Sequence, residues 1–176
     1  MNESSETTPL SPEINPEQYL ESIGPANKHN VSLLRNALQE TAQIEGIGGF
    51  MLAVGGTVTK ENPDKRKDID IRVGVKVDTN DIKQLPLLQR YEQQFERWSA
   101  VVNRVIGTIN TEGEFEVEID PPHPDREHEW MAANDGMVRI IPKKSGVPIE
   151  ILCHQEGSRI PPPFVKLFSN IDFESE

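Results

Sequence analysis

Cysteine, aromatic residues and long apolar runs are scarce in this sequence of 176 residues. Cys153 is the only cysteine, which excludes an internal disulfide framework and a zinc site built on cysteines. Aromatic residues make up 6% of the chain and hydrophobic residues 35%, so we expect part of it to stay outside a packed core. No run approaches the length of a membrane span, and no N-terminal apolar segment resembles a signal peptide. We therefore expect a cytoplasmic protein that does not use a membrane.

Positive charge is scarce as well, because 18 Lys and Arg stand against 29 Asp and Glu. Residues 1–21 contain five glutamates and no Lys or Arg, and the last six residues add three more acids. We expect a disordered acidic tail over residues 1–26, one domain over residues 27–160, and a proline-rich acidic tail over residues 161–176. The domain between the tails lacks a broad basic surface, which argues against strong binding to duplex DNA.

Hydrophobic periodicity predicts an α+β fold. Apolar residues at helical spacing predict helices, and short continuous or alternating apolar runs predict strands. Their order is typical of a mixed β-sheet of about four to five strands with helices packed on it. The predicted helices cover residues 30–44 and 87–106, and the predicted strands cover residues 50–54, 68–77, 115–119, 137–141 and 147–152.

A glycine pair and two aspartates lie close together in the sequence. Gly55, Gly56 and Thr57 follow the apolar strand, and eleven residues separate Gly56 from Asp68. Asp68 and Asp70 are two residues apart on the next predicted strand, so both side chains leave the same face of the sheet. Each feature alone is common, as a tight turn or an exposed strand face, but their combination at this spacing is much less common.

This combination suits a triphosphate and divalent cations. Paired carboxylates are hard oxygen ligands of the kind that Mg²⁺ or Mn²⁺ prefers. Glycines without Cβ atoms let backbone N–H groups approach phosphate oxygens, and the hydroxyl of Thr57 adds a donor. Four cations could contact a triphosphate: Lys60, Arg66, Lys67 and Arg72. For most of the cations in the loop before Asp68, a solvated surface is the preferred interpretation, because acidic residues are interleaved with them.

The stretch VGGTVTKENPDKRKDIDIRV, from Val54 to Val73, resembles the signature of the DNA polymerase beta-like nucleotidyltransferase superfamily. Its Gly-Gly-Thr variant is similar to that of abortive-infection and toxin-type nucleotidyltransferases, which suggests a toxin–antitoxin-like role. The resemblance implies the nucleotidyltransferase fold and a Mg²⁺-dependent transfer of a nucleoside monophosphate from an NTP to a hydroxyl. It also implies that Asp68 and Asp70 hold two metal ions.

The resemblance further implies a third carboxylate on an adjacent strand, flanked by apolar residues. Glu150 fits best, Glu118 also fits, and Asp120 fits less well. In this role Glu150 would help to hold the ion that activates the acceptor hydroxyl and would accept its proton. Glu150 is therefore our preferred third metal ligand and catalytic residue, and Glu118 is the alternative.

The acceptor cannot be read from the sequence, and a small molecule, an RNA or a protein would each fit. Many superfamily members carry a helical domain after the third carboxylate, and here 26 residues follow Glu150, many of them proline or polar. We expect the acceptor site to be built from residues 87–106 and 121–134 of this chain, or to be supplied by a second subunit or a protein partner. Two other interpretations stay open. One is an inactive module of the same fold that binds nucleotide or a protein partner, and the other is an acidic interaction protein with a coincidental motif.

Overall fold

The computed structural model of this chain describes residues 14–59, 66–122, 136–155, 158, 160 and 162–172. The segment between the third and fourth strands, where we expected a loop or short helix, lies mostly outside the described residues. The helices are α1 (Pro16–Ser22), α2 (Pro25–Glu45), α3 (Gly56–Thr59) and α4 (Leu87–Ile109), with a 3-10 turn at Asn80–Ile82. The strands are β1 (Gly49–Val54), β2 (Ile69–Val75), β3 (Phe115–Asp120), β4 (Met137–Pro142), β5 (Ile149–Cys153) and β6 (Phe164–Ser169).

The strands form one mixed sheet in the order β3-β4-β5-β2-β1-β6. The β2 and β5 strands are parallel neighbours, and every other neighbouring pair is antiparallel. The α+β class with a mixed sheet is confirmed. The expected strand number was too low, because β6 adds a sixth strand that the sequence pattern did not indicate.

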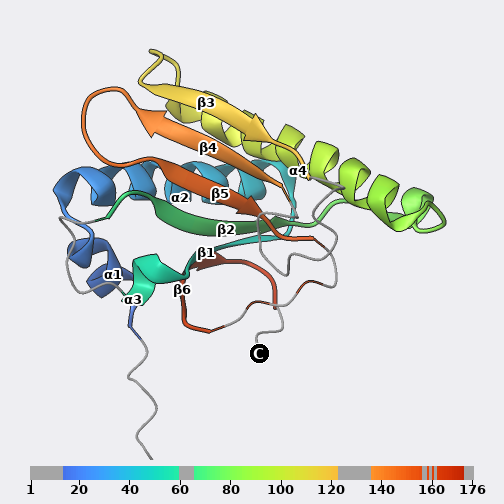
Figure 1. The fold of residues 1–176 in the computed structure, drawn as a ribbon, viewed down its shortest axis with the longest axis horizontal. Helices are drawn as coiled ribbons and strands as arrows, with labels where there is room; N and C mark the ends of the chain where they lie inside the picture. The colour runs from blue at the N-terminus through green and yellow to red at the C-terminus, as the bar shows by residue number, and fades with distance from the viewer. Residues whose placement is uncertain are drawn as a thin grey trace, which may run out of the picture.

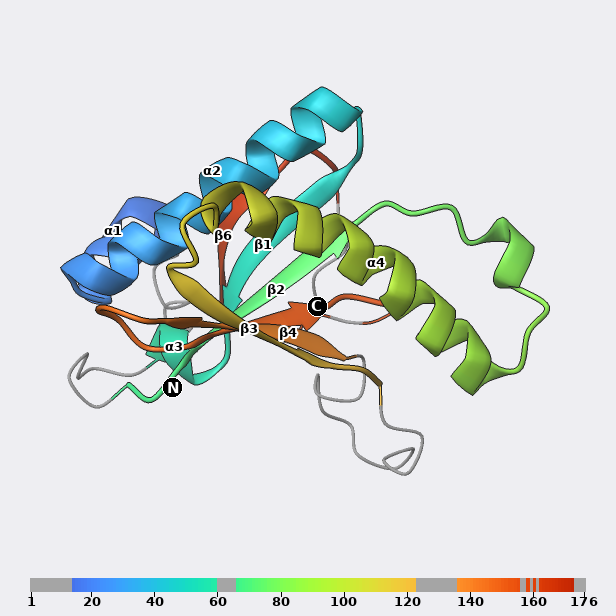
Figure 2. The ribbon, with the colours of Figure 1, turned by 90° about the horizontal axis from the view of Figure 1, so that it is seen from above.

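Helices α2 and α4 cover one face of the sheet (Figures 1 and 2). Leu34 and Leu38 of α2 and Trp98 and Val102 of α4 are buried in the core that they form with the strands. The indole N–H of Trp98 donates to the carbonyl of Val73 on β2 over 2.8 Å, which anchors α4 to the middle of the sheet. The N-terminal end of α4 extends beyond the sheet in Figure 1.

The opposite face of the sheet carries charged side chains. On β2, Ile69 and Ile71 are fully buried in the helix-side core, so Asp70 between them faces away from the helices. The same alternation places Glu150 on β5, Arg139 on β4 and Glu118 on β3 on that side. We call the surface formed by Glu118, Arg139, Glu150 and Asp70 the charged face. A small apolar cluster of Phe50, Leu52 and Ile160 lies on the same side, over β1.

The expected disordered tail over residues 1–26 is wrong for its second half, because α1 and the start of α2 lie there. Tyr19, Leu20 and Ile23 are 0–1% exposed and belong to the main core. Asn15 and Gln18 form a capping box at the start of α1, with the Gln18 N–H donating to Asn15 Oδ1 over 2.8 Å. The glutamates in this segment made it look unpacked, yet α1 keeps them on its surface and buries its few apolar residues.

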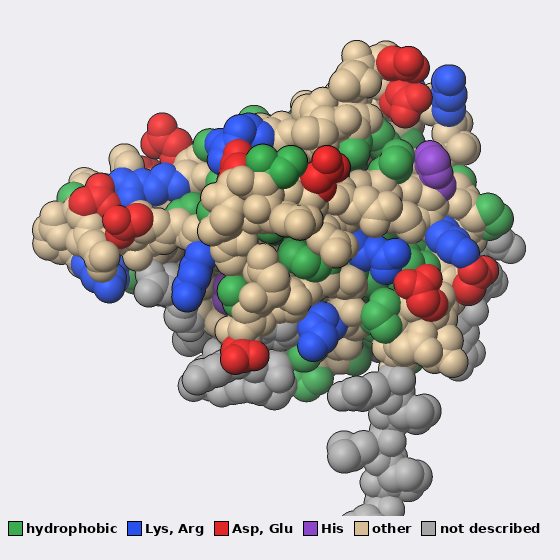
Figure 3. Space-filling model, turned by 180° about the vertical axis from the view of Figure 1, so that it is seen from behind, with side chains coloured by type: hydrophobic (Ala, Val, Ile, Leu, Met, Phe, Trp, Pro, Cys, Tyr) green, Lys and Arg blue, Asp and Glu red, His purple; other side chains and the backbone are tan. Residues whose placement is uncertain are grey.

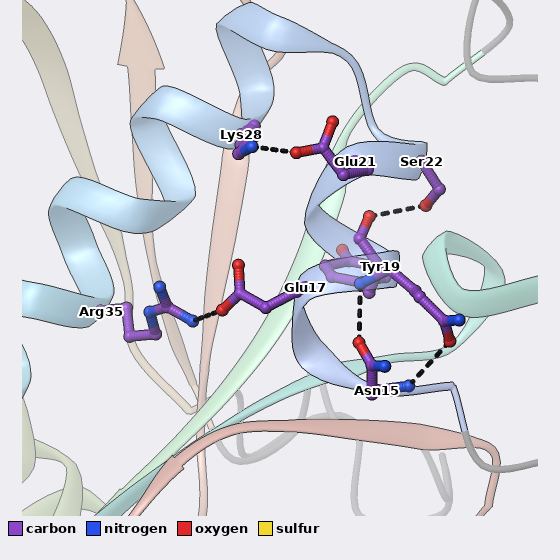
Figure 4. A network of polar contacts seen from close by, with 8 residues as sticks. Asn15, Glu17, Tyr19, Glu21, Ser22, Lys28 and Arg35 are labelled. Atoms are coloured by element: carbon purple, nitrogen blue, oxygen red, sulfur yellow. Dashed lines mark hydrogen bonds and ion pairs between the residues drawn. The ribbon is translucent and has the colours of Figure 1, made fainter.

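Two of those glutamates link α1 to α2. Glu17 accepts a hydrogen bond from Arg35 over 3.2 Å, and Glu21 pairs with Lys28 (Figure 4). These pairs are exposed, so each adds little to stability on its own. Their partners lie on α2, and the acidic character of the segment is therefore partly compensated within the fold.

The expected C-terminal tail over residues 161–176 is wrong as well, because β6 pairs with β1. Val165 and Leu167 of β6 are buried in the helix-side core. Asn170 extends the pairing, with its side chain accepting from the Gly49 N–H over 2.7 Å and donating to the Ile47 carbonyl. The prolines before β6 suggested the end of regular structure, whereas they precede a strand that forms one edge of the sheet.

Surface charge on the helix side is mixed rather than gathered by sign (Figure 3). Arg104 of α4 donates through Nε and Nη2 to both carboxylate oxygens of Glu45, at the end of α2, over 2.9 Å each. Arg97 makes a similar two-point contact with Asp81, at 2.8 and 2.7 Å. In each pair the hydrogen bond from the arginine is the main cause of the lowered pKa of the carboxyl group.

A bilayer-crossing helix is not found in the part of the chain that the structure describes. The two longest helices, α2 and α4, each present one polar side and one apolar side. Their apolar sides are used against the sheet and against one another. The apolar sides of both helices are thus buried in the core of this domain.

Candidate functional site

The glycine pair forms the turn between β1 and α3. Strand β1 is buried along almost its whole length, and it ends at Val54. Gly55 has φ +65, a left-handed conformation that favours glycine. A Cβ placed on Gly55 would lie 3.6 Å from Oδ2 of Asp70, so the turn lies directly against that carboxylate. The backbone N–H of Val58 donates to the Gly55 carbonyl over 3.1 Å and closes the turn.

The two aspartates lie at the start of β2. Asp68 precedes the strand and Asp70 is its second residue, and both are half-buried. The Ile69 N–H between them donates to the Pro148 carbonyl over 2.9 Å, which holds this end of β2 against the entry to β5. The strand predicted over residues 68–77 thus forms over Ile69–Val75 with the expected alternation, and Asp70 lies beside the glycine turn.

Glu150 is the neighbour of Asp70 across the sheet. In the parallel β2–β5 pair, Asp70 and Glu150 are register partners, so their backbones are about 4.8 Å apart. Glu118 lies on β3, which is separated from β2 by both β4 and β5. Of the two candidates for a third carboxylate, the structure therefore brings only Glu150 next to Asp70.

The N-terminal part of α2 holds the turn that leads into β5. The side chain of Asn30 donates to the Ser145 carbonyl over 3.1 Å, and Asn27 Oδ1 accepts from the Val147 N–H over 2.9 Å. Gly146 sits between these contacts with φ +108, and a Cβ there would lie 2.6 Å from Asn30 Nδ2. These contacts position the start of β5, and hence Glu150, relative to β2.

Arg139 lies between the two candidate glutamates, a contact that sequence reasoning missed. It is the register partner of Glu118 on β3 and of Glu150 on β5. Its Nη1 is 3.7 Å from Glu118 Oε2, and its Nε is 3.8 Å from Glu150 Oε1. Both distances are those of ion pairs rather than of hydrogen bonds. The sequence placed Arg139 on a strand before Glu150, but only the register of three strands shows that it contacts both acids.

Carboxylate oxygens are the type of ligand that a Mg²⁺ or Mn²⁺ site uses. Asp68, Asp70 and Glu150 offer hard oxygen donors from two neighbouring strands, and no nitrogen or sulfur donor is needed. As the side chains stand, the described residues contain no group of three or more His, Cys, Asp or Glu that could hold a metal ion. Asp70 and Glu150 are register partners, and the Glu150 carboxylate forms an ion pair with Arg139.

The predicted phosphate-binding residues have different surroundings. Gly56 and Thr57 lie in α3, and the side chain of Thr57 is outside the described residues, as are Lys60 and Lys65. Lys67 is exposed beside Asp68, as expected of a solvated loop. Arg66 is only 6% exposed, so it does not belong to a solvated loop surface.

Buried Arg72, in the middle of β2, lies against the half-buried His154, which follows β5. Arg72 is 6% exposed, and its Nη1 lies 3.5 Å from Nδ1 of His154. The His154 ring also packs edge-on against Phe50, with ring centroids 5.1 Å apart, and its backbone N–H donates to the Val73 carbonyl. Burial, and next the charge of Arg72, lower the pKa of His154 to about 4, so the imidazole is neutral at pH 7.

The arrangement gathers carboxylates and a glycine turn at one end of β1, β2 and β5. It offers a phosphate-sized anion the backbone of the Gly55 turn and a divalent cation the oxygens of Asp68, Asp70 and Glu150. Comparison of the chain with models of known protein families and with curated proteins finds no match to either.

Proposed function

We propose that this protein is a divalent-metal-dependent nucleotidyltransferase that moves a nucleoside monophosphate from an NTP to a hydroxyl acceptor. One observation carries the proposal: the β2–β5 register pairs Asp70 with Glu150, and the Gly55 turn lies against the same aspartate. The three carboxylates and the glycine turn are the parts that the resemblance to the nucleotidyltransferase superfamily requires. They come from three neighbouring strands, β1, β2 and β5, that are separated in the sequence.

In the proposed reaction the acceptor oxygen attacks the α-phosphorus of the NTP. A new P–O bond forms, the bond from the α-phosphorus to the bridging oxygen breaks, and pyrophosphate leaves with the bonding electrons. Asp68, Asp70 and Glu150 would hold Mg²⁺ or Mn²⁺, which supplies charge neutralisation on the phosphates and lowers the pKa of the acceptor hydroxyl. Glu150 takes up the proton of the acceptor.

The remaining site residues orient the triphosphate. The Gly55–Gly56 turn presents backbone without Cβ atoms to phosphate oxygens, and Thr57 contributes backbone at the start of α3. Lys67 and Arg72 flank the aspartates and add positive charge that partly balances the phosphates. The acceptor is a small molecule, an RNA or a protein, and a protein partner or a second copy of the chain is a candidate for completing its site.

The direct test is transfer of label from each α-labelled NTP in the presence of Mg²⁺ or Mn²⁺. Wild type is compared with Asp68→Asn and Asp70→Asn, which keep side-chain volume and remove the charges. The matched control is Glu40→Gln, a loss of charge at an exposed position of α2, on the other side of the sheet. We expect label on an added acceptor, or on the protein itself, with wild type and the control, and none with either aspartate variant. Transfer that survives in both variants would contradict the proposal.

A second candidate function is a module that binds nucleotide or a protein partner without chemistry. The observation that favours it is the ion pair between Glu150 and Arg139, because this contact engages the carboxylate that the proposed reaction needs as a proton acceptor. It predicts metal-dependent NTP binding, measurable by calorimetry, with no transfer under any condition. Absence of both metal binding and NTP binding would rule out the transferase and the nucleotide-binding module.

A further inference from the structure

Strand β3 is an edge strand with a defined outward side. It pairs with β4 alone among the described strands. The Lys143 N–H donates to the Glu114 carbonyl over 3.0 Å, which makes these two residues a hydrogen-bonded pair of the antiparallel ladder. Because hydrogen-bonded and non-hydrogen-bonded pairs alternate, the N–H and C=O groups of Phe115, Val117 and Ile119 point away from β4. They line the outer edge of the sheet.

The first of these outward positions already has a strand-like partner. The Phe115 N–H donates to Asn110 Oδ1 over 2.8 Å, and Asn110 Nδ2 donates to the Phe115 carbonyl over 3.1 Å. The side-chain amide of Asn110 thus imitates a neighbouring strand at this residue. Within the described part of the chain, the outward groups of Val117 and Ile119 have no backbone partner.

The rest of the β3 edge lacks three of the features that block a further strand, and its remaining protection is negative charge. Natural edge strands are protected by proline, by lysine and other charged side chains, or by a β-bulge. Residues 115–120 contain no proline or lysine, and their register with β4 is unbroken. The side chains of Val117 and Ile119 are 40% and 53% exposed on the helix side. Backbone groups and apolar side chains are therefore both available to a partner.

The charge of β3 selects among the partners that could add a strand. Glu114, Glu116 and Glu118 are exposed, and Glu116 and Glu118 lie on the charged face. An antiparallel pairing of β3 with its copy around Val117 would place Glu116 directly opposite Glu118, which is destabilising. The undescribed segments 1–13 and 123–135 carry net negative charge in their sequence and would suffer the same repulsion.

We propose that the edge of β3 docks an extended segment of a partner protein in which Lys or Arg alternates with apolar or β-branched residues. In the added strand, residues opposite Val117 and Ile119 point to the helix side and contact those side chains. Residues opposite Glu116 and Glu118 point to the charged face, where basic side chains pair with the two carboxylates. Main-chain hydrogen bonds to Val117 and Ile119 hold the segment, and the alternation supplies its specificity.

The test uses two fluorescent ten-residue peptides of identical composition. One alternates Lys with Val or Thr, and the other groups its lysines in one block. Both peptides carry the same charge, so a difference in affinity reports the alternation of their residues. We expect the alternating peptide to bind the full-length protein at least tenfold more tightly in fluorescence anisotropy. Hydrogen exchange then locates the site: saturating alternating peptide should slow the amides of Val117 and Ile119 at least tenfold. The Glu116 amide, which faces β4, should not change.

Two charge-reversal variants distinguish binding at the β3 edge from attraction by the net charge of the protein. Glu116→Lys should weaken binding of the alternating peptide at least tenfold, because it opposes a lysine of the added strand. Glu40→Lys changes the net charge equally at an exposed position of α2 and should leave binding within twofold. Unfolding midpoints measured for both variants establish that the sheet is intact.

Three results would overturn the proposal. One is equal affinity of the two peptides, and another is binding of the alternating peptide without protection of Val117 and Ile119. Either would show attraction by charge alone. The third is concentration-dependent self-association that protects these two amides without peptide, which would make a second copy the occupant. None of these outcomes depends on whether the protein transfers nucleotides.

Discussion

At the residue scale, the two glutamates on either side of Arg139 have different surroundings. Glu150 stands next to Asp70 on the neighbouring parallel strand, and Glu118 lies two strands beyond it on an edge. Both contact the same guanidinium, at 3.8 and 3.7 Å. A proton acceptor for the proposed reaction must reach a substrate held by the aspartates, and only Glu150 is placed to do so.

The first prediction compares Glu150→Gln with Glu118→Gln. Each variant removes one charge beside Arg139, so the two are matched in their effect on that residue. We expect Glu150→Gln to lower the rate of nucleotidyl transfer by about 100-fold or more, whereas Glu118→Gln keeps it within about threefold. Single-turnover transfer measures the rate, and unfolding midpoints control for stability. Equal losses in both variants would assign the effect to Arg139 and contradict a separate role for Glu150.

The second prediction concerns His154, whose pKa is about 4 in the folded protein. The ordinary value in an unfolded chain is about 6.5. Between these values the unfolded state binds more protons than the folded state, so stability falls as pH drops from about 6.5 to 4. Below that range both states are protonated and no further loss comes from this group. The half-buried imidazole beside Arg72 is therefore neutral at pH 7, and protonating it lowers the free energy of unfolding.

Urea unfolding of wild type and His154→Gln at pH 7, 5.5 and 4 measures this contribution. We expect the stability difference between the two proteins to shift by up to about 3 kcal/mol in favour of the variant as pH falls. Other titrating groups affect both proteins alike and cancel in the difference. A difference that stays constant with pH would show that His154 has an ordinary pKa.

At the element scale, β5 depends on a contact between α2 and the turn before it. Asn27 and Asn30, near the start of α2, bond to the backbone on both sides of Gly146. The turn sets where β5 begins, and the Ile69–Pro148 hydrogen bond then aligns β5 with β2. The position of Glu150 is thus set by a helix more than a hundred residues earlier in the chain.

The third prediction compares Gly146→Ala with Gly107→Ala. At Gly146 the backbone has φ +108 and a Cβ would meet Asn30 at 2.6 Å, so we expect a loss of about 1–3 kcal/mol. Gly107 lies in α4 with nothing within 4 Å of a new Cβ, and alanine there should add about 0.5–1 kcal/mol. Chemical denaturation measures the free energy of unfolding of both variants. A stable Gly146→Ala protein would show that the turn is not constrained by α2.

At the scale of the whole molecule, the two ends of the described chain complete the fold. Helix α1 contributes Leu20 to the core that α2 and α4 share with the sheet, and β6 closes the edge beyond β1. Both segments contact one another as well as the rest of the domain. The domain therefore extends at least from residue 16 to residue 169, beyond the expected limits of residues 27 and 160.

The fourth prediction tests α1 as part of this core. Leu20 is 0% exposed, and Leu20→Ala should cost about 2–5 kcal/mol of unfolding free energy. Ile44 on α2 is 76% exposed, and Ile44→Ala should change stability by about 0.5 kcal/mol or less. Both are measured by urea unfolding. A Leu20→Ala protein as stable as Ile44→Ala would mean that α1 does not pack in solution.

Local pattern was sufficient for the two long helices and for five of the six strands of the described chain. The apolar run of β1, the alternation of β2 and the long helical stripe of α4 are visible in the sequence because each depends on neighbouring residues. Gly55, Asp68 and Asp70 stand out by their spacing in the sequence, whereas the contact between Gly55 and Asp70 depends on the antiparallel pairing of β1 with β2. The buried Arg66 and the pairing of Arg72 with His154 have no such local signal.

The sequence by itself indicated the two long helices and five of the strands, and it predicted that Asp68 and Asp70 share a face. Tertiary structure decided that Glu150 rather than Glu118 lies next to Asp70, and that α1 and β6 belong to the domain. Strand order and register depend on pairings between residues far apart in the chain, which no local period encodes. Likewise, a short segment with few apolar residues folds only because surfaces formed elsewhere bury them, as Leu20 shows.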